Sequence, residues 1–389
     1  MKKELTIRIA GEAGQGTQTI GLALCRIFKK AGLFVFANQD FMSRIRGGNN
    51  YFQVRVSREP VASLRGSCDV AVCLDRASVD LHRKALAPGG RMIFDKDKFK
   101  MDPAGASPFH APLYDMAQKT GGSELFVNAA ACGALTSLVS LEFEICAQVL
   151  GTIFADKGQD IINKNIDVAR AGYDFMKANA NANVFALDPE PVAKTLLLNG
   201  HEAIALGAVK AGCKFYSAYP MSPSTSIIEN ISRYAGKFNI IVEQAEDEIA
   251  AMNMVIGASF AGVRSMCGTS GGGFALMVEG LSLAGMLETP IVAVDAQRPA
   301  PATGFPTRTE QADLDFLIHA GHGEFARAIY APGSIEEAFY LTQKAFNTAE
   351  KYQVPALIMS DQYLADSYRN IEMFDMKKNP VKRSILSKE

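Results

Sequence analysis

Three consecutive acidic residues precede an almost wholly apolar stretch of the chain. Glu246-Asp247-Glu248 is followed by Ile249-Ala-Ala-Met-Asn-Met-Val-Ile-Gly-Ala258, and this composition predicts a helix that is buried on all sides. Glu248 on the first turn of such a helix needs a partner, because an unpaired charge is costly to bury. Thr269-Ser-Gly-Gly-Gly273 follows the next predicted strand, and its glycines permit close approach to the backbone. Together the two segments are suited to hold a flat heterocycle and to hydrogen-bond a ring nitrogen.

Both segments also have a purely structural interpretation. Acidic residues favour helix N-termini because they offset the macrodipole, which accounts well for Glu246 and Asp247. The glycines can serve a tight turn that needs positive φ. The sequence leaves these alternatives open.

Two further segments follow predicted strands, at the sheet edge where ligands usually bind in parallel α/β folds. Tyr219-Pro-Met-Ser-Pro-Ser-Thr225 offers hydroxyls on a loop that prolines restrict, although Ser222 or Ser224 can equally cap the next helix. Arg298 follows the strand that contains Asp295, and its guanidinium suits a carboxylate. The alternative for Arg298 is a surface ion pair, and Glu310-Gln311-Ala-Asp313 either joins the same site or faces water.

Composition excludes several classes of function. The net charge of −1 gives no electrostatic case for nucleic acid or an anionic membrane surface. No apolar run reaches the ~18 residues that a membrane span needs. The seven cysteines form no C-x-x-C pair, so we expect no iron–sulfur cluster held by this chain alone. Free thiols at scattered apolar positions favour a reducing, cytoplasmic location. The histidines form no metal-binding pattern, and no metal site is predicted.

The chain of 389 residues predicts two α/β domains with mostly parallel sheets, because strands and helices alternate in both halves. The first domain is predicted over 1–185 and the second over 196–375. Residues 186–195 are the expected linker, since they follow an alternating Ala-Asn run and contain two prolines. The lysine-rich segment 376–389 is expected to be a frayed tail.

In the first half, Gly11-Glu-Ala-Gly-Gln-Gly16 lies between a predicted strand and a predicted helix. It is not a G-x-G-x-x-G motif, so dinucleotide binding is not favoured. Ser43-Arg-Ile-Arg-Gly-Gly48 places two cations beside two glycines. This segment is either a phosphate-binding loop or a solvated turn.

Taken together, these segments resemble the 2-oxoacid:ferredoxin oxidoreductases, over nearly the whole chain. The similarity is to an alpha subunit with a gamma-type domain fused at its N-terminus. The gamma-like motifs are Gly11–Gly16, Ser43–Gly48 and Val54–Ser57. The alpha-like motifs, in order, are Tyr219–Ser224, Glu246–Ala251, Gly257–Gly262, Thr269–Gly271, Leu276–Glu279 and Gln297–Gly304.

The resemblance implies that the second domain binds the pyrimidine of thiamine diphosphate and that Glu248 hydrogen-bonds N1′ of this ring. It implies substrate contacts from Ser222 and Arg298, and cofactor contacts from Tyr219, Pro220, Thr269, Ser270 and Gly271. The reaction it implies is oxidative decarboxylation of a 2-oxoacid, 2-oxoglutarate or a broad range, to an acyl-coenzyme A. Electrons would pass through iron–sulfur clusters to ferredoxin.

The chain contains no G-D-G…N segment for a magnesium–diphosphate group. The resemblance therefore implies a beta-type partner subunit that supplies this half of the site, the Mg²⁺ and the 4Fe-4S clusters. Relative to the family pattern, Tyr-Pro-Met-Ser-Pro, Thr-Ser-Gly-Gly-Gly and Arg-Pro-Ala-Pro-Ala-Thr-Gly are altered, which bears on substrate size. Family alpha subunits usually continue into a further α/β domain, and we expect that domain to be missing here.

Three other functions are compatible with parts of the sequence. The chain can be half of another thiamine-dependent enzyme of the transketolase or lipoamide-linked type, although such enzymes lack the gamma-like half. It can be a non-catalytic assembly or binding subunit, which the altered glycine segment and the missing domain favour. A nicotinamide-dependent dehydrogenase is the third alternative.

Overall fold

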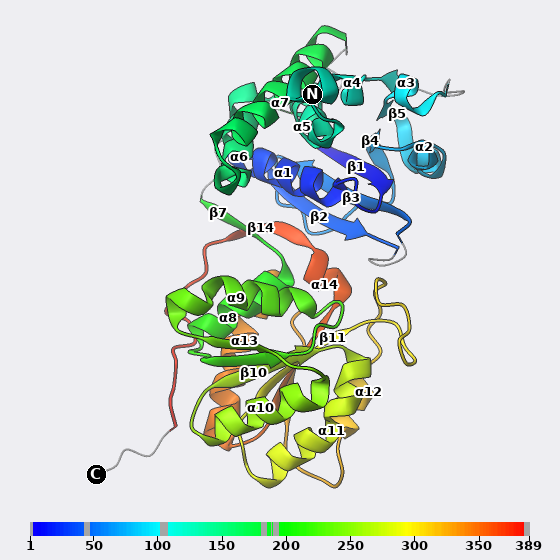
Figure 1. Ribbon diagram of the computed structural model, residues 1–389. Helices are drawn as coiled ribbons and strands as arrows, with labels where there is room; N and C mark the ends of the chain where they lie inside the picture. Colours follow the sequence, from blue (N-terminus) through cyan, green and yellow to red (C-terminus); the bar gives the residue numbers. More distant parts are fainter. Residues whose placement is uncertain are drawn as a thin grey trace. The chain divides into compact units, whose positions relative to one another are not determined.

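The computed structural model describes residues 3–42, 47–101, 108–179, 185–187, 189 and 194–384. The chain divides into two compact units, and each is described by itself (Figure 1). The first unit is Met1–Leu197 with Tyr368–Glu372, and the second is Leu198–Ser367 with Met373–Glu389. The sequence-based boundaries assign 196–375 to one domain, whereas the structure places Tyr368–Glu372 in the sheet of the first unit.

Among the described residues, the first unit contains an eight-stranded sheet in the order β6-β5-β4-β1-β3-β2-β14-β7. Its strands are β1 (Glu4–Glu12), β2 (Phe34–Asp40), β3 (Asn49–Ser57), β4 (Cys68–Cys73), β5 (Leu86–Phe94), β6 (Pro108–His110), β7 (Thr195–Leu198) and β14 (Tyr368–Glu372).

This sheet is mixed, whereas we expected mostly parallel strands. The neighbours β1, β4, β5 and β6 are parallel, but β3 is antiparallel to both β1 and β2. The reason is local: only residues 41–48 connect β2 to β3, and a parallel crossover needs a dozen or more residues. Strand β14 is also antiparallel to β2.

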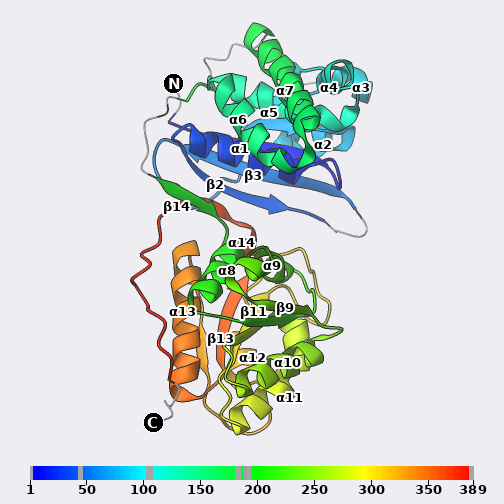
Figure 2. The same cartoon turned by 60° about the vertical axis from the view of Figure 1, so that its left-hand side comes forward.

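Helices cover the first sheet and supply its largest apolar core (Figure 2). They are α1 (Thr17–Lys30), α2 (Arg76–His82), α3 (Lys96–Phe99), α4 (Leu113–Gly121), α5 (Val127–Leu138), α6 (Phe143–Ile153) and α7 (Gln159–Asn179). Helix α5 is buried along almost its whole length. It packs so closely on α7 that a Cβ at Gly133 would lie 1.8 Å from the carbonyl oxygen of Ala169.

The second unit contains a six-stranded sheet, within the described residues, in the order β12-β13-β11-β10-β8-β9. Its strands are β8 (Phe215–Ala218), β9 (Ile241–Gln244), β10 (Ser265–Thr269), β11 (Val292–Gln297), β12 (Ala328–Tyr330) and β13 (Ala356–Asp361). All neighbouring pairs are parallel, as expected for this half. The carboxyl ends of these strands therefore lie along one edge of the sheet.

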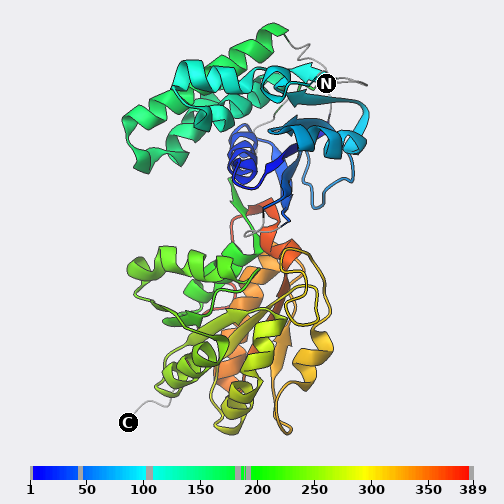
Figure 3. The ribbon, with the colours of Figure 1, turned by 45° about the vertical axis from the view of Figure 1, so that its right-hand side comes forward.

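The helices of the second unit are α8 (Gly200–Lys210), α9 (Thr225–Phe238), α10 (Glu248–Phe260), α11 (Gly271–Met286), α12 (Leu314–His319), α13 (Ile335–Tyr352) and α14 (Gln362–Asp366). Figure 3 shows α10, α11 and α12 together on one face of the sheet, where they share an apolar cluster with β10 and β11. The α/β class predicted from the sequence is confirmed for both units.

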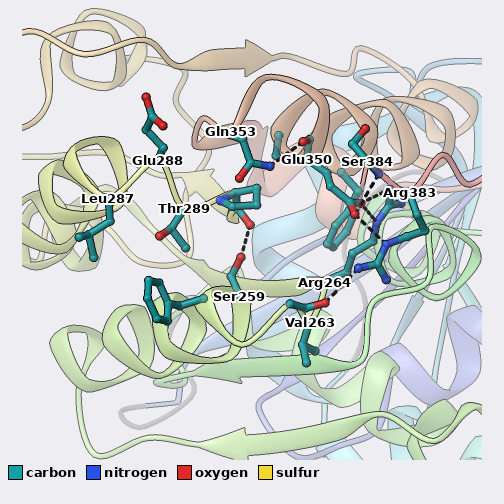
Figure 4. A pocket seen from close by; sticks show the side chains of 15 residues that line it. Ser259, Val263, Arg264, Leu287, Glu288, Thr289, Glu350, Gln353, Arg383 and Ser384 are labelled. Carbon is teal, nitrogen blue, oxygen red and sulfur yellow. Dashed lines mark hydrogen bonds and ion pairs between the residues drawn. The ribbon is translucent and has the colours of Figure 1, made fainter. Parts of the chain in front are cut away.

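The C-terminal segment is not frayed over the part that the structure describes. Arg264 Nη2 donates to the Lys382 carbonyl at 2.5 Å, and Arg383 Nε donates to Glu350 Oε1 at 2.7 Å. These contacts lie beside a cavity of about 300 Å³ against α13 (Figure 4). Because Glu350 is buried and pairs with both arginines, the expected frayed tail is wrong up to Ser384.

The seven cysteines are all buried and unpaired. Their positions agree with small core residues, as the apolar sequence around them predicts. No helix within the described residues combines the length and apolarity of a membrane span.

Candidate functional site

Glu248 begins helix α10 and is buried. Asp247 is the N-cap, and its side chain accepts a hydrogen bond from the backbone N–H of Ala250 at 2.7 Å. Asp247 therefore serves the helix end, and Glu248 is left to point inward with 3% of its surface exposed. Its Oε1 atom is buried without a hydrogen-bond partner. A buried polar atom of this kind calls for an explanation, and a missing ligand is one.

Burial raises the pKa of Glu248, and the neighbouring Asp247 adds to the rise. The backbone N–H of Glu248 and the charge of Arg298 oppose it. The carboxyl group is thus shifted toward holding a proton, which suits a group that exchanges one with a ligand.

The glycine segment is the first turn of helix α11, not a loop. The sequence predicts a helix from Phe274, but α11 begins at Gly271, with Ser270 as an N-cap whose side chain makes no cap hydrogen bond. Glycine has a low helix propensity, so the sequence predicts a start that is three residues too late. Glycine stands here because Glu248 approaches the backbone closely. A Cβ at Gly273 would lie 2.1 Å from Thr269 Oγ1 and 2.6 Å from Glu248 Oε1.

Thr269 and Ser270 are fully buried at the end of β10. Thr269 Oγ1 lies 3.7 Å from Met221 Sδ, so this strand end contacts the loop that follows β8. Ser270 Oγ has no hydrogen-bond partner. Thr269 lies beside Glu248, because both side chains reach the space next to Gly273, and the cofactor contacts expected of Thr269, Ser270 and Gly271 stay a prediction.

Ser222 and Arg298 come together from two strand ends. Arg298 Nη1 donates to the Ser222 carbonyl oxygen at 2.6 Å. Arg298 is buried, which lowers its pKa, while the charge of Glu248 opposes this. No ion pair of Arg298 occurs in the part of the chain that the structure describes. The surface ion pair considered from the sequence is therefore not observed, and neither Ser222 nor Ser224 caps α9 with its side chain.

Tyr219 and Pro220 begin the loop that follows β8. Tyr219 is 41% exposed and Pro220 is partly exposed at the start of the loop. No contact joins either side chain to Glu248 or Arg298 among the described residues. Their predicted contacts to a cofactor remain a prediction.

Two carboxyl groups also lie here: Asp295, which the sequence analysis did not propose for the site, and Asp313, for which it left open the site or solvent and which is buried. Asp295 of β11 is opposite Thr269 of β10 and is 1% exposed, and its carboxyl group faces that of Asp313, to which it can donate a hydrogen bond when it holds a proton. Asp313 lies against α11, where its Oδ2 atom is 2.6 Å from the position of a Cβ at Gly271. Burial raises the pKa of both, and Asp313 adds to the rise for Asp295. The sequence signal was an aspartate inside the apolar run Val292-Ala-Val-Asp-Ala296.

The N-terminal motifs lie only in part within the described residues. Ser43–Arg46 lie outside the described residues, so the predicted pair of cations there is not placed. The Gly11–Gly16 turn closes on itself, because the Glu12 N–H donates to Gln15 Oε1 at 2.7 Å. Gly16 has φ 80°, and a Cβ there would lie 2.0 Å from Asn128 Nδ2.

Comparisons with known proteins agree over both units. A family model described as "Pyruvate flavodoxin/ferredoxin oxidoreductase, thiamine diP-bdg" matches residues 206–388, and one described as "Pyruvate ferredoxin/flavodoxin oxidoreductase" matches 6–175. The 2-oxoacid:ferredoxin oxidoreductase subunit alpha of a Sulfolobus species is 31% identical, over 96% of this chain and 67% of the relative. The 2-oxoglutarate synthase subunit KorA of Methanocaldococcus jannaschii is 41% identical, over 48% of this chain and 52% of its own.

A solved structure is also similar over nearly all of the chain. It is the 2-oxoglutarate:ferredoxin oxidoreductase from Magnetococcus marinus with 2-oxoglutarate, coenzyme A and succinyl-CoA bound. The identity is 33% and the TM-score 0.89, covering 98% of this chain and 68% of that one. With the alpha-subunit relatives, this shows that the chain belongs to the 2-oxoacid:ferredoxin oxidoreductase family, as an alpha-type subunit with a gamma-type domain at its N-terminal end.

Proposed function

We propose that this subunit carries the pyrimidine half of a thiamine diphosphate site in an enzyme that oxidatively decarboxylates a 2-oxoacid to an acyl-coenzyme A. The single observation that carries the proposal is the buried Oε1 atom of Glu248, which has no partner and faces Gly273. An aminopyrimidine nitrogen at this position would satisfy that oxygen.

The residues present fit this cofactor. A flat ring needs a surface without side chains, and α11 begins with three glycines beside Thr269 and Ser270. It also needs a carboxyl group at one ring nitrogen. Glu248 supplies this group, and its Oε1 atom fits in its position because Gly273 has no Cβ. When bound, the cofactor supplies the electron sink for decarboxylation, and the protein supplies position and electrostatics. Glu248 holds or releases the proton at N1′ of the ring.

Arg298 and the Ser222 loop are the proposed contacts to the substrate. One guanidinium nitrogen is used by the Ser222 carbonyl, and no other hydrogen bond of this group occurs within the described residues. The remaining N–H groups can hold a carboxylate in the bidentate manner that arginine favours. The similar enzyme from Magnetococcus marinus has 2-oxoglutarate bound, which supports 2-oxoglutarate or a related 2-oxoacid as the substrate.

The site requires a partner subunit. The chain has no G-D-G…N segment, and we propose that a beta-type subunit supplies the magnesium–diphosphate half and the 4Fe-4S clusters. Helices α10 and α11 present exposed apolar side chains next to Glu248, with Ile249 at 47% and Leu276 at 50% exposure. These two residues and Leu283 line a groove of about 150 Å³. A partner that completes the site would cover this face.

Two further partners follow from the proposal. Coenzyme A accepts the acyl group, and the gamma-type first unit is the proposed contributor of its contacts in this chain. Ferredoxin receives the electrons by way of the clusters in the partner. The proposed contacts of Tyr219 and Pro220 with the cofactor belong to the same assembly.

Reconstitution tests the proposal. The purified chain is mixed with a beta-type subunit, thiamine diphosphate, Mg²⁺, coenzyme A and 2-oxoglutarate, and reduction of a viologen dye is followed. We expect dye reduction that depends on both subunits and on coenzyme A. Full turnover by the single chain would refute the shared site. A reconstituted complex with normal activity after Glu248→Gln would instead favour a purely structural role for this residue.

A further inference from the structure

A histidine that the proposed reaction does not use lies buried behind the substrate loop. His201, on the first turn of α8, has no exposed surface. Its Nδ1 atom lies 2.8 Å from Ser226 Oγ at the start of α9, and its Nε2 atom lies 3.0 Å from Ser360 Oγ near the end of β13. The ring thus links three separate elements of the second unit.

The ring of His201 is neutral, and both of its nitrogens face a hydroxyl group. Burial lowers the pKa of His201 to about 3, so one nitrogen donates while the other accepts. Ser226 Oγ, which lies against Nδ1, also donates to the Pro223 carbonyl oxygen at 3.4 Å. Ser226 therefore connects the ring to the loop that contains Pro223.

The same set of bonds continues to the residue that precedes Arg298. Gln297 Nε2 donates to the Ser360 carbonyl at 3.1 Å, and Gln297 Oε1 accepts from the Asp313 N–H at 3.0 Å. Gln297 and Ser360 are both buried, so these amide and hydroxyl groups have no water to exchange with. The strand ends of β11 and β13 are therefore fixed relative to each other, with His201 bound to one of them.

On its other side, His201 holds the loop that carries Ser222. The ring contacts Ser226 on the first turn of α9, and the Ser226 hydroxyl donates to the Pro223 carbonyl. Ser222, next to Pro223, is the residue whose carbonyl binds Arg298. One neutral ring thus fixes this loop against the strand ends that position Arg298. A side chain that only filled space would need none of these polar contacts.

We propose that His201 is a positioning residue that holds the Tyr219–Thr225 loop for binding of the 2-oxoacid carboxylate. The substrate part rests on the proposed function, whereas the loop part concerns this chain alone. His201 touches neither substrate nor cofactor. It acts through Pro223 and Ser226 on Ser222 and Arg298.

The first test uses hydrogen exchange of the free full-length chain, followed by mass spectrometry. His201→Leu removes both hydrogen bonds, and His201→Gln retains a donor and an acceptor. We expect exchange in peptides covering 219–226 to be about tenfold faster in His201→Leu, as loss of a buried hydrogen bond implies, and near the wild-type rate in His201→Gln. The first turn of α10 should be unchanged. Unchanged exchange in 219–226 would overturn the proposal.

A matched control is His82→Leu in the first unit. His82 is also buried and hydrogen-bonded, with Nε2 at 2.8 Å from Asn49 Oδ1, and it is not part of the site. This variant should leave exchange in 219–226 unchanged. If His201→Leu fails to fold, the nitrogen chemical shifts of His201 in the wild-type chain decide: a ring that stays neutral from pH 5 to 9 supports the buried, hydrogen-bonded position, and a ring that titrates in this range contradicts it.

The second test uses the reconstituted complex and separates the inference from the proposed function. For His201→Leu we expect the KM for 2-oxoglutarate to rise about tenfold, on the same hydrogen-bond argument, with the affinity for thiamine diphosphate unchanged. Recovery in His201→Gln would distinguish positioning from packing. An active complex whose KM is unaffected would overturn the substrate role of His201. An inactive wild-type complex would count against the proposed function, while the exchange result still decides the loop.

Discussion

The two units differ in how they treat buried polar side chains. In the first unit, Arg8 donates to Gln53 at 2.8 Å and contacts His82 at 3.3 Å, and His82 contacts Asn49 at 2.8 Å. Asn49 in turn donates to the Ser78 hydroxyl at 2.6 Å. These groups form a continuous set of hydrogen bonds.

The second unit instead gathers buried polar oxygens that lack ordinary partners at one edge of its sheet. Glu248 Oε1 and Ser270 Oγ have no hydrogen-bond partner, and the carboxyl groups of Asp295 and Asp313 face each other. The first unit has Thr6 and Asn128 oxygens of this kind, but those residues are uncharged. Leaving a buried polar group unsatisfied costs free energy, so the concentration of such groups at this edge supports the proposed ligand site.

The largest effect is expected from Glu248→Gln. The glutamine keeps the shape but cannot take up a proton, and general acid–base groups typically contribute about 10²–10⁴-fold to rate. We expect dye reduction by the reconstituted complex to fall within this range. The variant chain should remain folded by circular dichroism, because no hydrogen bond of Oε1 is lost. Activity within about twofold of wild type would contradict the role given to this side chain.

Gly273→Ala should come next. Its added methyl group would overlap Thr269 Oγ1 and Glu248 Oε1, and overpacking a buried site costs about 1–3 kcal/mol. We expect lower stability in thermal unfolding and a loss of activity of at least about tenfold, the factor that corresponds to about 1.4 kcal/mol.

The control for this variant is Gly272→Ala on the same turn. Its nearest contact would be the Ala302 carbonyl oxygen at 3.3 Å, which requires only a small shift. Equal losses in the two variants would show that the whole turn, rather than the approach of Glu248, requires glycine.

His82→Leu tests the set of buried hydrogen bonds in the first unit. It leaves Arg8 and Asn49 each without one buried partner, a loss worth about 1–3 kcal/mol. We expect the free energy of unfolding of the first unit to fall by this amount while the kcat of the reconstituted complex is unchanged. A stable variant would mean that these bonds contribute little, and the contrast between the units would lose its energetic basis.

Asp295→Asn tests the buried carboxyl groups of the second unit through the pH dependence of stability. Burial and Asp313 raise the pKa of Asp295 well above its ordinary 3.8, so the folded chain retains a proton that the unfolded chain has lost. Stability is then greatest below that ordinary value and falls as pH rises toward the folded pKa, by up to about 1.4 kcal/mol per pH unit. Asp295→Asn should remove this share of the slope in denaturant unfolding between pH 4 and 8. An unchanged slope would show that Asp295 is not the proton-holding group.

Local patterns in the sequence predicted much of the site. The almost entirely apolar run after Glu248 indicated that its carboxyl group is buried, because a helix without a polar face has no solvent side. The positions of Ser222 and Arg298 after strands indicated a shared sheet edge, and the structure brings them together at 2.6 Å. The roles of these residues toward ligands stay predictions.

What the sequence could not supply depends on distant contacts. Strand β14 joins the first sheet through Asn370, whose Oδ1 accepts from the Val35 N–H across 335 positions of the chain. The neighbourhood of Asp295 and Asp313 likewise depends on packing between β11 and the start of α12. The start of α11 was misplaced because glycine disfavours helices in isolation, whereas here the close approach of Glu248 requires it.

The most direct test of the shared site is calorimetric titration of thiamine diphosphate with Mg²⁺ into this chain, into a beta-type subunit and into their mixture. The account predicts binding only in the mixture, weakened about tenfold by Glu248→Gln, as loss of a hydrogen bond to a charged group implies. Equally tight binding by this chain alone, or affinity in the mixture that is indifferent to Glu248→Gln, would contradict it.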